Sequence, residues 1–303
     1  MNKFPQDTHI GKRARRIRPF LVCPVCYGDL SDIGSTLVCG AKHTFGRTEE
    51  GVPLLMLDEL IVKHADEHLS GVNRLKSFLK KYPKFYYYVV WGLFCPVLMW
   101  ENPPTKLLKY LKTDPLVADI GSGPQRVHDS FINLDIYPFP GVDVVGTGHF
   151  IPIKDGTFDG VINETVIEHI SDERAFVSEM TRIVKPGGVV YTSAPFIHPF
   201  HGSPDDFHRF TTSALKELFK KDYEILEVGI RSGPWSAFLM FLCYWFGNII
   251  TLGNRRLAPF AAHIFMLVLG PFKIFDPLFT WMPNADAVSA VLYIIARKQK
   301  NEA

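Results

Sequence analysis

The sequence lacks a strong net charge, a disulfide framework and a secretory leader. Lys and Arg number 33 and Asp and Glu 31 in 303 residues, so overall charge favours no class of partner. Five cysteines, three of them near the start, fit reduced thiols better than paired disulfides. The basic N-terminal arm runs into Cys23-Pro24 rather than into an apolar segment, so no signal peptide is visible. We therefore expect a cytoplasmic protein.

Charge is also scarce in one long internal stretch. Only four residues between Ser232 and Met282 are charged, and the 18 residues from Trp235 to Leu252 carry no charge. That length is at the threshold for a helix that spans a bilayer. We expect residues 232–285 to form a hydrophobic helical insertion that lies in a membrane interface, with Trp and Tyr at headgroup depth. A packed helical lid or a dimer interface is the alternative.

The first 56 residues divide into a basic tail and a small module. Residues 1–18 contain five Lys or Arg residues between Lys12 and Arg18, which suit lipid or RNA phosphates but also suit a solvated disordered tail. Residues 19–56 hold a C-x2-C-x12-C-x3-H pattern, and two such knuckles can converge tetrahedrally on zinc. The expected structural zinc ligands are Cys23, Cys26, Cys39 and His43. A module this short needs the metal to fold as an independent unit.

Strand character followed by a glycine turn occurs at Val117 to Gly123, Val-Ala-Asp-Ile-Gly-Ser-Gly. In an open α/β sheet such a turn brings the backbone against a nucleotide-like ligand at the carboxyl end of a strand. Three further segments follow in order: Leu134-Asp-Ile136, Phe158-Asp-Gly-Val-Ile-Asn163 and Val184-Lys-Pro-Gly-Gly188. Together these segments resemble the class I S-adenosylmethionine-dependent methyltransferases, over roughly residues 113–230.

The resemblance implies an α/β fold with a Rossmann-like sheet of seven strands, six parallel and the last antiparallel. The methyltransferase domain would comprise residues 113–231 and 286–300, with the hydrophobic insertion between its sixth and seventh strands. Residues 57–112 would form a helical linker. Only eleven residues separate Gly123 from Asp135, so the first crossover helix should shrink to about one turn or to a loop.

S-adenosylmethionine is the cofactor that the resemblance implies. The expected cofactor-binding residues are Asp119, Gly121, Ser122, Gly123, Asp135, Thr147, Asn163 and Glu164. Asp135 would accept hydrogen bonds from the ribose hydroxyls. Thr147 stands where many relatives hold the adenine amino group with a carboxylate, and Gln125 stands where they often have a third glycine. The sequence departs from the family at these two positions.

Ionisable side chains crowd the segment Pro195 to Phe210, just past the expected fifth strand. We expect His201 and Asp206, with His198 beside them, to position the methyl acceptor and to take a proton where the acceptor is a hydroxyl. A metal site made from these histidines and aspartates is a less favoured alternative. Glu168-His169 looks like an acid–base pair, but this pattern recurs in relatives with many substrates and so favours a structural or cofactor-side role.

The sequence thus predicts methyl transfer from S-adenosylmethionine to an apolar or lipid-linked acceptor, such as a quinone precursor, at the cytoplasmic face of a membrane. An RNA methyltransferase is one alternative, because the cysteine module resembles zinc ribbons of some RNA and protein methyltransferases. An apolar insertion near the active-site mouth argues against it. The second alternative is a non-catalytic membrane-associated scaffold with a decayed cofactor site, in view of Gln125 and Thr147. Oligomeric state is not indicated.

Overall fold

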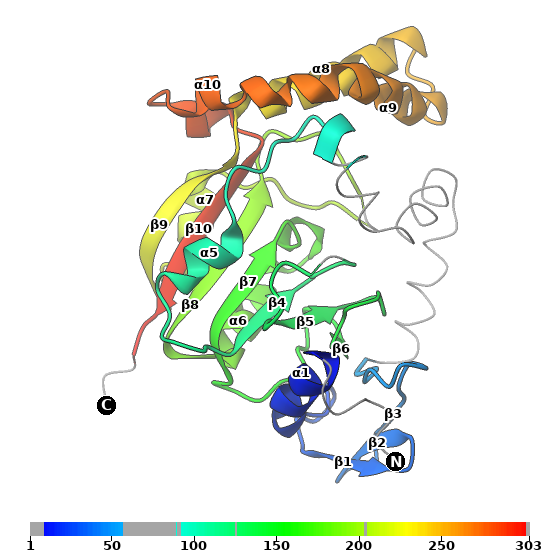
Figure 1. Ribbon diagram of the computed structural model, residues 1–303, viewed down its shortest axis with the longest axis vertical. Coiled ribbons are helices and arrows are strands. Elements are labelled where there is room, and N and C mark those ends of the chain that lie inside the picture. Colours follow the sequence, from blue (N-terminus) through cyan, green and yellow to red (C-terminus); the bar gives the residue numbers. More distant parts are fainter. Residues whose placement is uncertain (1–8, 57–88, 90–91, 125, 203–204, 301–303) are drawn as a thin grey trace.

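A seven-stranded mixed sheet forms the centre of the computed structural model, which describes residues 9–56, 89, 92–124, 126–202 and 205–300 (Figure 1). The sheet order is β6-β5-β4-β7-β8-β10-β9. Its strands are β4 (Val117–Ile120), β5 (Ile132–Asp135), β6 (Val144–Val145), β7 (Phe158–Glu164), β8 (Val184–Pro195), β9 (Tyr223–Ser232) and β10 (Val291–Lys298). Strands β4 to β8 pair in parallel, and β10 runs antiparallel to both β8 and β9. The expected fold class is confirmed.

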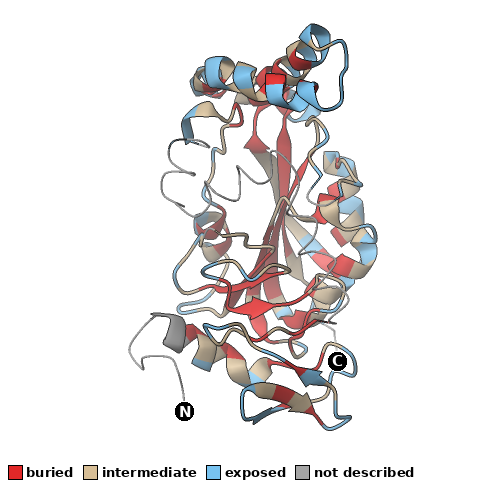
Figure 2. Ribbon diagram, turned by 90° about the vertical axis from the view of Figure 1, so that its right-hand side faces the viewer, coloured by how far each residue is buried: buried red, intermediate tan, exposed pale blue. Residues whose placement is uncertain are grey.

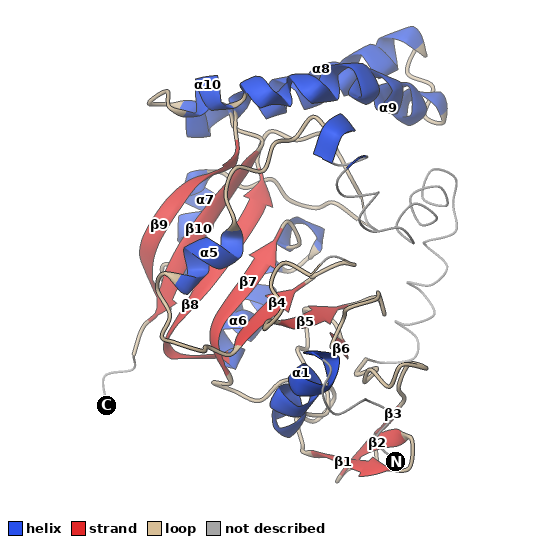
Figure 3. Ribbon diagram, viewed as in Figure 1, coloured by secondary structure: helices blue, strands red, loops and turns tan. Residues whose placement is uncertain are grey.

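Helices cover both faces of this sheet, as Figure 3 shows. On one face, α6 (Glu173–Ile183) and α7 (Thr212–Phe219) bury Phe176 and Phe219 against alternate strand residues. On the other, α5 (Pro103–Leu108) buries Leu107. Asp172 and Thr211 begin α6 and α7 as N-caps, each accepting a hydrogen bond from a backbone N–H of the first turn. Both faces of the sheet are therefore covered largely by apolar side chains.

The connection from β4 to β5 is a turn-rich loop in the residues that the structure describes between Gly121 and Phe131. The expected loss of the first crossover helix is confirmed there, and Gln125 lies outside the described residues. The helical linker expected over residues 57–112 lies mostly outside them too, with α5 as its longest described helix.

A three-stranded antiparallel sheet lies within residues 19–56, formed by β1 (Leu30–Ile33), β2 (Thr36–Cys39) and β3 (Thr44–Phe45). It is joined to the large sheet rather than standing apart. Leu54 bridges to Val145 in the edge strand β6, with Leu55 N–H donating to the Val145 carbonyl at 2.8 Å. Val145 N–H in turn donates to the Pro53 carbonyl at 3.0 Å. The backbone of this module thereby covers the β6 edge.

The described part of the basic tail is folded, unlike the solvated disordered tail that was one of its two interpretations. Its second half is helix α1 (His9–Ile17), followed by a 3₁₀ turn η1 (Arg18–Phe20). Arg13 is only 6% exposed, and its Nε lies 3.0 Å from Oδ1 of buried Asp143. Arg126 reaches the other oxygen of the same carboxylate at 2.8 Å. The Arg13 side chain is thus held in an internal ion pair and is not accessible to a phosphate partner.

The insertion is helical, as expected, and lies at the end of the molecule opposite the N-terminal module (Figure 1). It comprises α8 (Pro234–Ile250), α9 (Leu257–Leu269, continued by η4, Gly270–Phe275), α10 (Pro277–Thr280) and η5 (Ala285–Val288). Helices α8 and α9 pack closely at Gly247, where an added Cβ would lie 2.8 Å from the Ala258 carbonyl oxygen. One described helical run, Leu257–Phe275, has the length and composition to cross a membrane, with 28% of it buried.

Replacing Arg13 with alanine should lower the free energy of unfolding by about 2–3 kcal/mol, because the buried Asp143 carboxylate would lose one of its two cationic partners in the described chain. Arg16 is the matched control on the same helix. Its partner Asp114 is largely exposed and 3.6 Å away, so Arg16→Ala should cost less than about 0.5 kcal/mol. Urea unfolding followed by circular dichroism measures both, and equal losses would contradict the structural role of Arg13.

Candidate active site

The glycine turn at the carboxyl end of β4 is fastened to the neighbouring strand β5. Gly121 N–H donates to the Leu134 carbonyl at 2.8 Å, and Ser122 N–H reaches the same oxygen at 3.2 Å. Gly123 N–H donates to Oδ2 of Asp135 at 2.7 Å. Gly121 and Gly123 both adopt positive φ angles, +73° and +61°, which glycine accepts without strain. The Asp135 carboxylate therefore lies directly beside the turn, at the end of its strand.

Two buried polar side chains at this edge keep atoms without partners. Asp119 is 3% exposed, and no described residue donates to its Oδ2. Asn163 in β7 donates through Nδ2 to the Ile120 carbonyl at 3.2 Å, while its Oδ1 also lacks a donor within the described chain. Burial, followed by the nearby Glu164 and Asp135, raises the pKa of Asp119 to about 8. These acceptors fit the ammonium and hydroxyl donors of an aminoacyl-nucleoside ligand such as S-adenosylmethionine.

Glu164, at the end of β7, forms an ion pair that the sequence does not reveal. Its Oε1 lies 2.8 Å from Nη2 of Arg231 near the end of β9. The Arg231 side chain is 7% exposed, and its Nε and Nη1 have no acceptor among the described residues. In the sequence, the one feature that could have pointed to Arg231 is its charge at the end of the expected sixth strand.

The remaining predicted cofactor residues lie at the same edge. Ser122 belongs to the glycine turn, and Thr147 follows the end of β6, where it forms a bridge with Phe150. All eight predicted positions thus lie within or just after the carboxyl ends of β4, β5, β6 and β7. The parallel strands bring these residues from four segments of the chain to one edge.

The loop after β8 carries the predicted acceptor-side residues. Asp206 accepts hydrogen bonds from the His201 N–H at 2.8 Å and from Arg209 Nη2 at 2.5 Å. Burial alone would raise the pKa of Asp206, but the hydrogen bonds from Arg209 and His201 outweigh it and hold the pKa well below its usual range. Asp206 is therefore a weak proton acceptor. Its geometry suits it to hold the loop and to orient His201, whose Nδ1 lies 3.3 Å from its Oδ2.

His198 is the third predicted residue of this loop. Its Nδ1 lies 2.7 Å from the Pro199 carbonyl oxygen, and its ring lies 4.5 Å from the ring of His201, centroid to centroid. Burial, together with the adjacent His201 and Arg209, lowers the pKa of His198 to about 4. His198 is thus a neutral imidazole at pH 7, the form that can accept a proton.

Backbone hydrogen bonds tie the same loop to the base of the insertion. Phe196 N–H donates to the Ala290 carbonyl at 2.9 Å, and Ile197 N–H donates to Ser289 at 3.1 Å. Because β9 runs parallel to β8, the insertion also leaves the sheet from the carboxyl edge. The glycine turn, the histidine-rich loop and the start of the insertion therefore share one edge of the sheet.

The four cysteine-module residues converge, as the spacing predicts. Cys26 Sγ and Cys39 Sγ are 3.7 Å apart, and His43 Nδ1 lies 3.3 Å from Cys39 Sγ and 3.5 Å from Cys23 Sγ. A tetrahedral zinc ion with bonds of about 2.3 Å to sulfur separates two thiolates by about 3.8 Å. The donor set and its spacing therefore fit a closed four-ligand zinc site.

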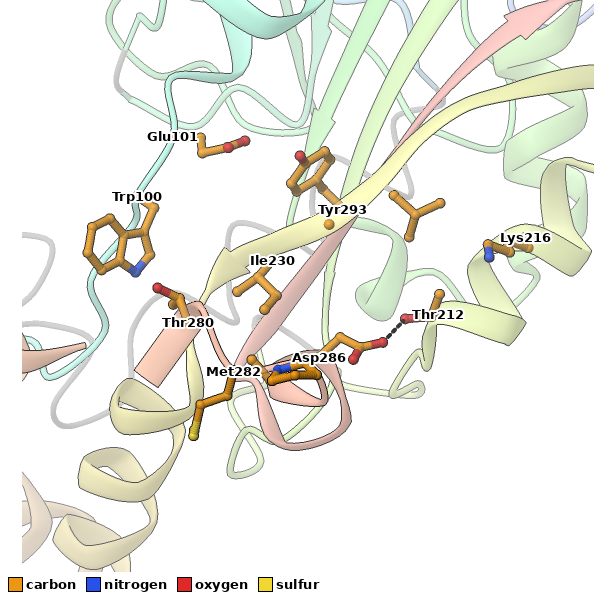
Figure 4. A pocket seen from close by; sticks show the side chains of 13 residues that line it. Trp100, Glu101, Thr212, Lys216, Ile230, Thr280, Met282, Asp286 and Tyr293 are labelled. Carbon is orange, nitrogen blue, oxygen red and sulfur yellow. Dashed lines mark hydrogen bonds between the residues drawn. The ribbon is translucent and has the colours of Figure 1, made fainter. Parts of the chain in front are cut away.

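A cavity of about 720 Å³ lies elsewhere in the described part of the chain. It wraps the β9 edge of the sheet, between α7 and the base of the insertion, and Figure 4 shows Trp100, Thr212, Asp286 and Tyr293 around it. None of the predicted cofactor or acceptor residues lines it. This cavity is an open hollow at the surface. The polar side chains that meet at the carboxyl edge of the sheet form the stronger candidate site.

A family model described as a methyltransferase domain matches residues 119–192, which include the glycine turn and the ends of β5 and β7. The chain contains a class I S-adenosylmethionine-dependent methyltransferase domain. The methyltransferase domain is similar to two curated proteins in particular. Over 58 residues it is 43% identical to a "Probable S-adenosylmethionine-dependent methyltransferase" of Mycolicibacterium smegmatis, covering 19% of this chain and 23% of that protein. Over 121 residues it is 26% identical to the ubiquinone/menaquinone biosynthesis C-methyltransferase UbiE of Klebsiella pneumoniae, covering 36% and 48%.

The matched segments thus span less than half the length of these relatives. Among solved structures, the methyltransferase domain is similar in fold to the Burkholderia thailandensis 1,6-didemethyltoxoflavin-N1-methyltransferase with bound 1,6-didemethyltoxoflavin and S-adenosylhomocysteine. The identity is 13%, with 88% of this chain and 100% of that chain covered and a TM-score of 0.43. At this level the likeness concerns the fold alone.

Alanine at Gly121 should destabilise the methyltransferase domain more than alanine at Gly123. Both substitutions place a side chain at positive φ, which costs about 1–2 kcal/mol. At Gly121 the new Cβ would also lie 2.3 Å from a methyl carbon of Val166, whereas at Gly123 nothing lies within 4 Å. We expect a further loss of about 1–3 kcal/mol for Gly121→Ala in the free energy of unfolding by urea. Similar losses for the two variants would show that the Val166 contact is not a constraint.

Proposed function

We propose that this protein transfers the methyl group of S-adenosylmethionine to an apolar or lipid-linked small molecule at the cytoplasmic face of a membrane. The observation that supports it most is the convergence of Asp135, the glycine turn and the unpartnered atoms of Asp119 and Asn163 at one sheet edge. The cofactor supplies an electrophilic methyl group on a positively charged sulfur. The protein contributes mainly alignment, since proximity supplies much of the rate enhancement in such a transfer.

Each side chain at this edge takes a defined part in the proposal. Asp135 accepts the ribose hydroxyls while it holds Gly123, and Asp119 and Asn163 accept the cofactor's ammonium group. His198, neutral at pH 7, accepts a hydrogen bond from a hydroxyl acceptor, and its lowered pKa makes it a weak base as well. Asp206 orients His201 rather than acting as a base.

The insertion supports an apolar acceptor. The relatives include proteins named as quinone-biosynthesis methyltransferases, among them the demethylmenaquinone methyltransferase of Geobacillus, 35% identical over 82 residues that cover 26% of this chain and 35% of that protein. In this chain the insertion departs from the edge that holds the glycine turn, so a membrane-seated insertion would place the acceptor loop at the lipid surface. An acceptor dissolved in the bilayer could then reach the methyl donor without crossing water.

The two long insertion helices have exposed faces (Figure 2), and large apolar residues occupy them. Exposed examples are Phe238, Phe241, Trp245 and Ile249 in α8, and Phe260, Ile264, Leu267 and Val268 in α9. The insertion's charges avoid these faces. Buried Asp276 accepts from Gly233 and Ser236 at the start of α8, Lys273 donates to the Cys95 carbonyl, and Arg255 and Arg256 are exposed at the hairpin tip. This distribution suits a hairpin that lies in the interface, with its arginines among the phosphates.

A structural zinc ion at Cys23, Cys26, Cys39 and His43 completes the proposal. Four protein ligands leave no open position for chemistry, so the ion would stabilise the N-terminal module that covers the β6 edge. The RNA alternative is weaker, because two arginines of the basic arm already have acidic partners: Arg13 pairs with buried Asp143, and Arg18 pairs with Asp32 at the surface.

Binding of S-adenosylmethionine should strengthen as pH rises toward 8. Asp119 must lose its proton to hold a cation, so well below its pKa of about 8 the apparent affinity should rise by up to tenfold per pH unit, and the rise should end near pH 8, where the cofactor's own ammonium group also loses its proton. Asp119→Asn should bind more weakly and lose most of this dependence. Isothermal titration calorimetry from pH 6 to 9 measures both proteins. Absence of binding at every pH would overturn the proposed function and favour the scaffold alternative.

The protein should sediment with vesicles of phosphatidylcholine and phosphatidylglycerol. Replacing both Phe241 and Trp245 with glutamate should lower the partition coefficient at least tenfold, because each ring buries about 150–250 Å² in the bilayer interface. Ile33→Glu is the matched control, since Ile33 is 61% exposed but lies in the N-terminal module. Failure of the unaltered protein to sediment, or an equal loss of partitioning in the control, would contradict the proposal that the insertion lies in the membrane interface.

A further inference from the structure

Glu168 is a buried carboxylate with no hydrogen-bonded partner among the residues that the structure describes. It lies in the 3₁₀ turn η3 (Ile167–His169) just after β7, its side chain is 0% exposed, and neither of its oxygens accepts a hydrogen bond from the described chain. A buried charge left in this state is costly, so such groups pair with cations or bind metals. The methyl-transfer scheme above uses no atom of Glu168.

Two imidazoles lie beside this carboxylate. Nε2 of His201 lies 3.5 Å from Oε1 of Glu168, and Nε2 of His169 lies 3.9 Å from the same oxygen. A direct charge-assisted hydrogen bond would bring nitrogen and oxygen to about 2.7–2.9 Å. The observed separations are too long for such bonds, and they match the spacing of two ligands around one metal ion with bonds of about 2.0–2.2 Å.

Both histidines are oriented through their other ring nitrogen. His169 Nδ1 lies 2.5 Å from the carbonyl oxygen of Asp205, which can only accept, so Nδ1 carries the proton and Nε2 keeps its lone pair. His201 Nδ1 lies 3.3 Å from the Asp206 carboxylate, which Arg209 holds in place. Metal-bound histidines typically have such a carbonyl or carboxylate behind the ring.

Backbone contacts hold the two halves of this cluster together. Phe207 N–H donates to the Glu168 carbonyl at 2.8 Å, and His208 N–H reaches the same oxygen at 3.4 Å. The loop after β8 is therefore fixed against the turn after β7. The two nitrogens and a Glu168 oxygen lie within 4.8 Å of one another, although the histidines are separated by 32 positions in the sequence.

We propose that Glu168, His169 and His201 bind a divalent transition-metal ion. Two imidazoles and one carboxylate suit Zn²⁺, Fe²⁺ or Mn²⁺, and three protein ligands leave coordination positions open. The site is distinct from the cysteine cluster, whose four ligands all come from the N-terminal module. The open positions would take an oxygen of the acceptor and lower its proton affinity. That role rests on the proposed function, whereas the metal site itself does not.

Manganese(II) is a suitable probe, because nitrogen and oxygen ligands suit it better than the thiolates of the cysteine cluster. Full-length protein that carries one equivalent of zinc is titrated with Mn²⁺, and free Mn²⁺ is followed by electron paramagnetic resonance. We expect one bound ion per chain. Affinity should fall at least tenfold in Glu168→Gln and in His201→Ala. Should the buried Glu168 variant fail to fold, His201→Ala decides, since its side chain is 31% exposed.

His208→Ala is the matched control. His208 lies in the same loop, but its Nε2 faces Glu173 at 3.4 Å, so its removal should leave Mn²⁺ affinity unchanged. Equal Mn²⁺ binding in His201→Ala and the unaltered protein would overturn the proposal, as would the absence of both bound Mn²⁺ and a second equivalent of zinc. The titration contains no S-adenosylmethionine, so its failure is distinguishable from failure of cofactor binding.

Discussion

Close packing between Gly121 and Val166 constrains the whole carboxyl edge of the sheet. A side chain at Gly121 would overlap Val166, so the conformation of the glycine turn and that of the segment after β7 depend on each other. Val166 leads directly into Ile167, Glu168 and His169. The turn expected to face the methyl donor and the cluster expected to face the acceptor therefore share one steric contact. A displacement of either segment would therefore change the packing of the other.

The order and type of most strands could be predicted from the sequence, because local signals mark them. Asp135 ends a short apolar run and does end β5, and Thr211 precedes an apolar helical pattern and does cap α7. The short span between Gly123 and Asp135 excluded an ordinary crossover helix, and a loop is found there. These features depend on residues close together in the chain, which periodicity and turn chemistry reveal.

Long-range ion pairs could not be predicted in the same way. Arg13 reads as one of several basic residues in an exposed arm, and its partner Asp143 is 130 positions away. Arg231 pairs with Glu164 across 67 positions, and the acceptor loop meets Glu168 only because two strand ends are adjacent in the sheet. Asp206 was predicted as part of the leading catalytic pair. The hydrogen bond from Arg209 lowers the pKa of Asp206 and makes it a poor base, and the sequence does not reveal that contact. Partners of this kind are decided by topology rather than by local pattern.

The two ends of the hydrophobic insertion return to the same point of the sheet. Ser232 and Val291 are direct cross-strand partners, and Ala290 N–H donates to the Gly233 carbonyl at 3.3 Å. A short turn could therefore replace the whole insertion without altering the strand order. The insertion is topologically a removable attachment on an otherwise ordinary β9–β10 hairpin. A chain of this design could gain or lose its apolar part by a single exchange of sequence, while its central sheet stayed the same.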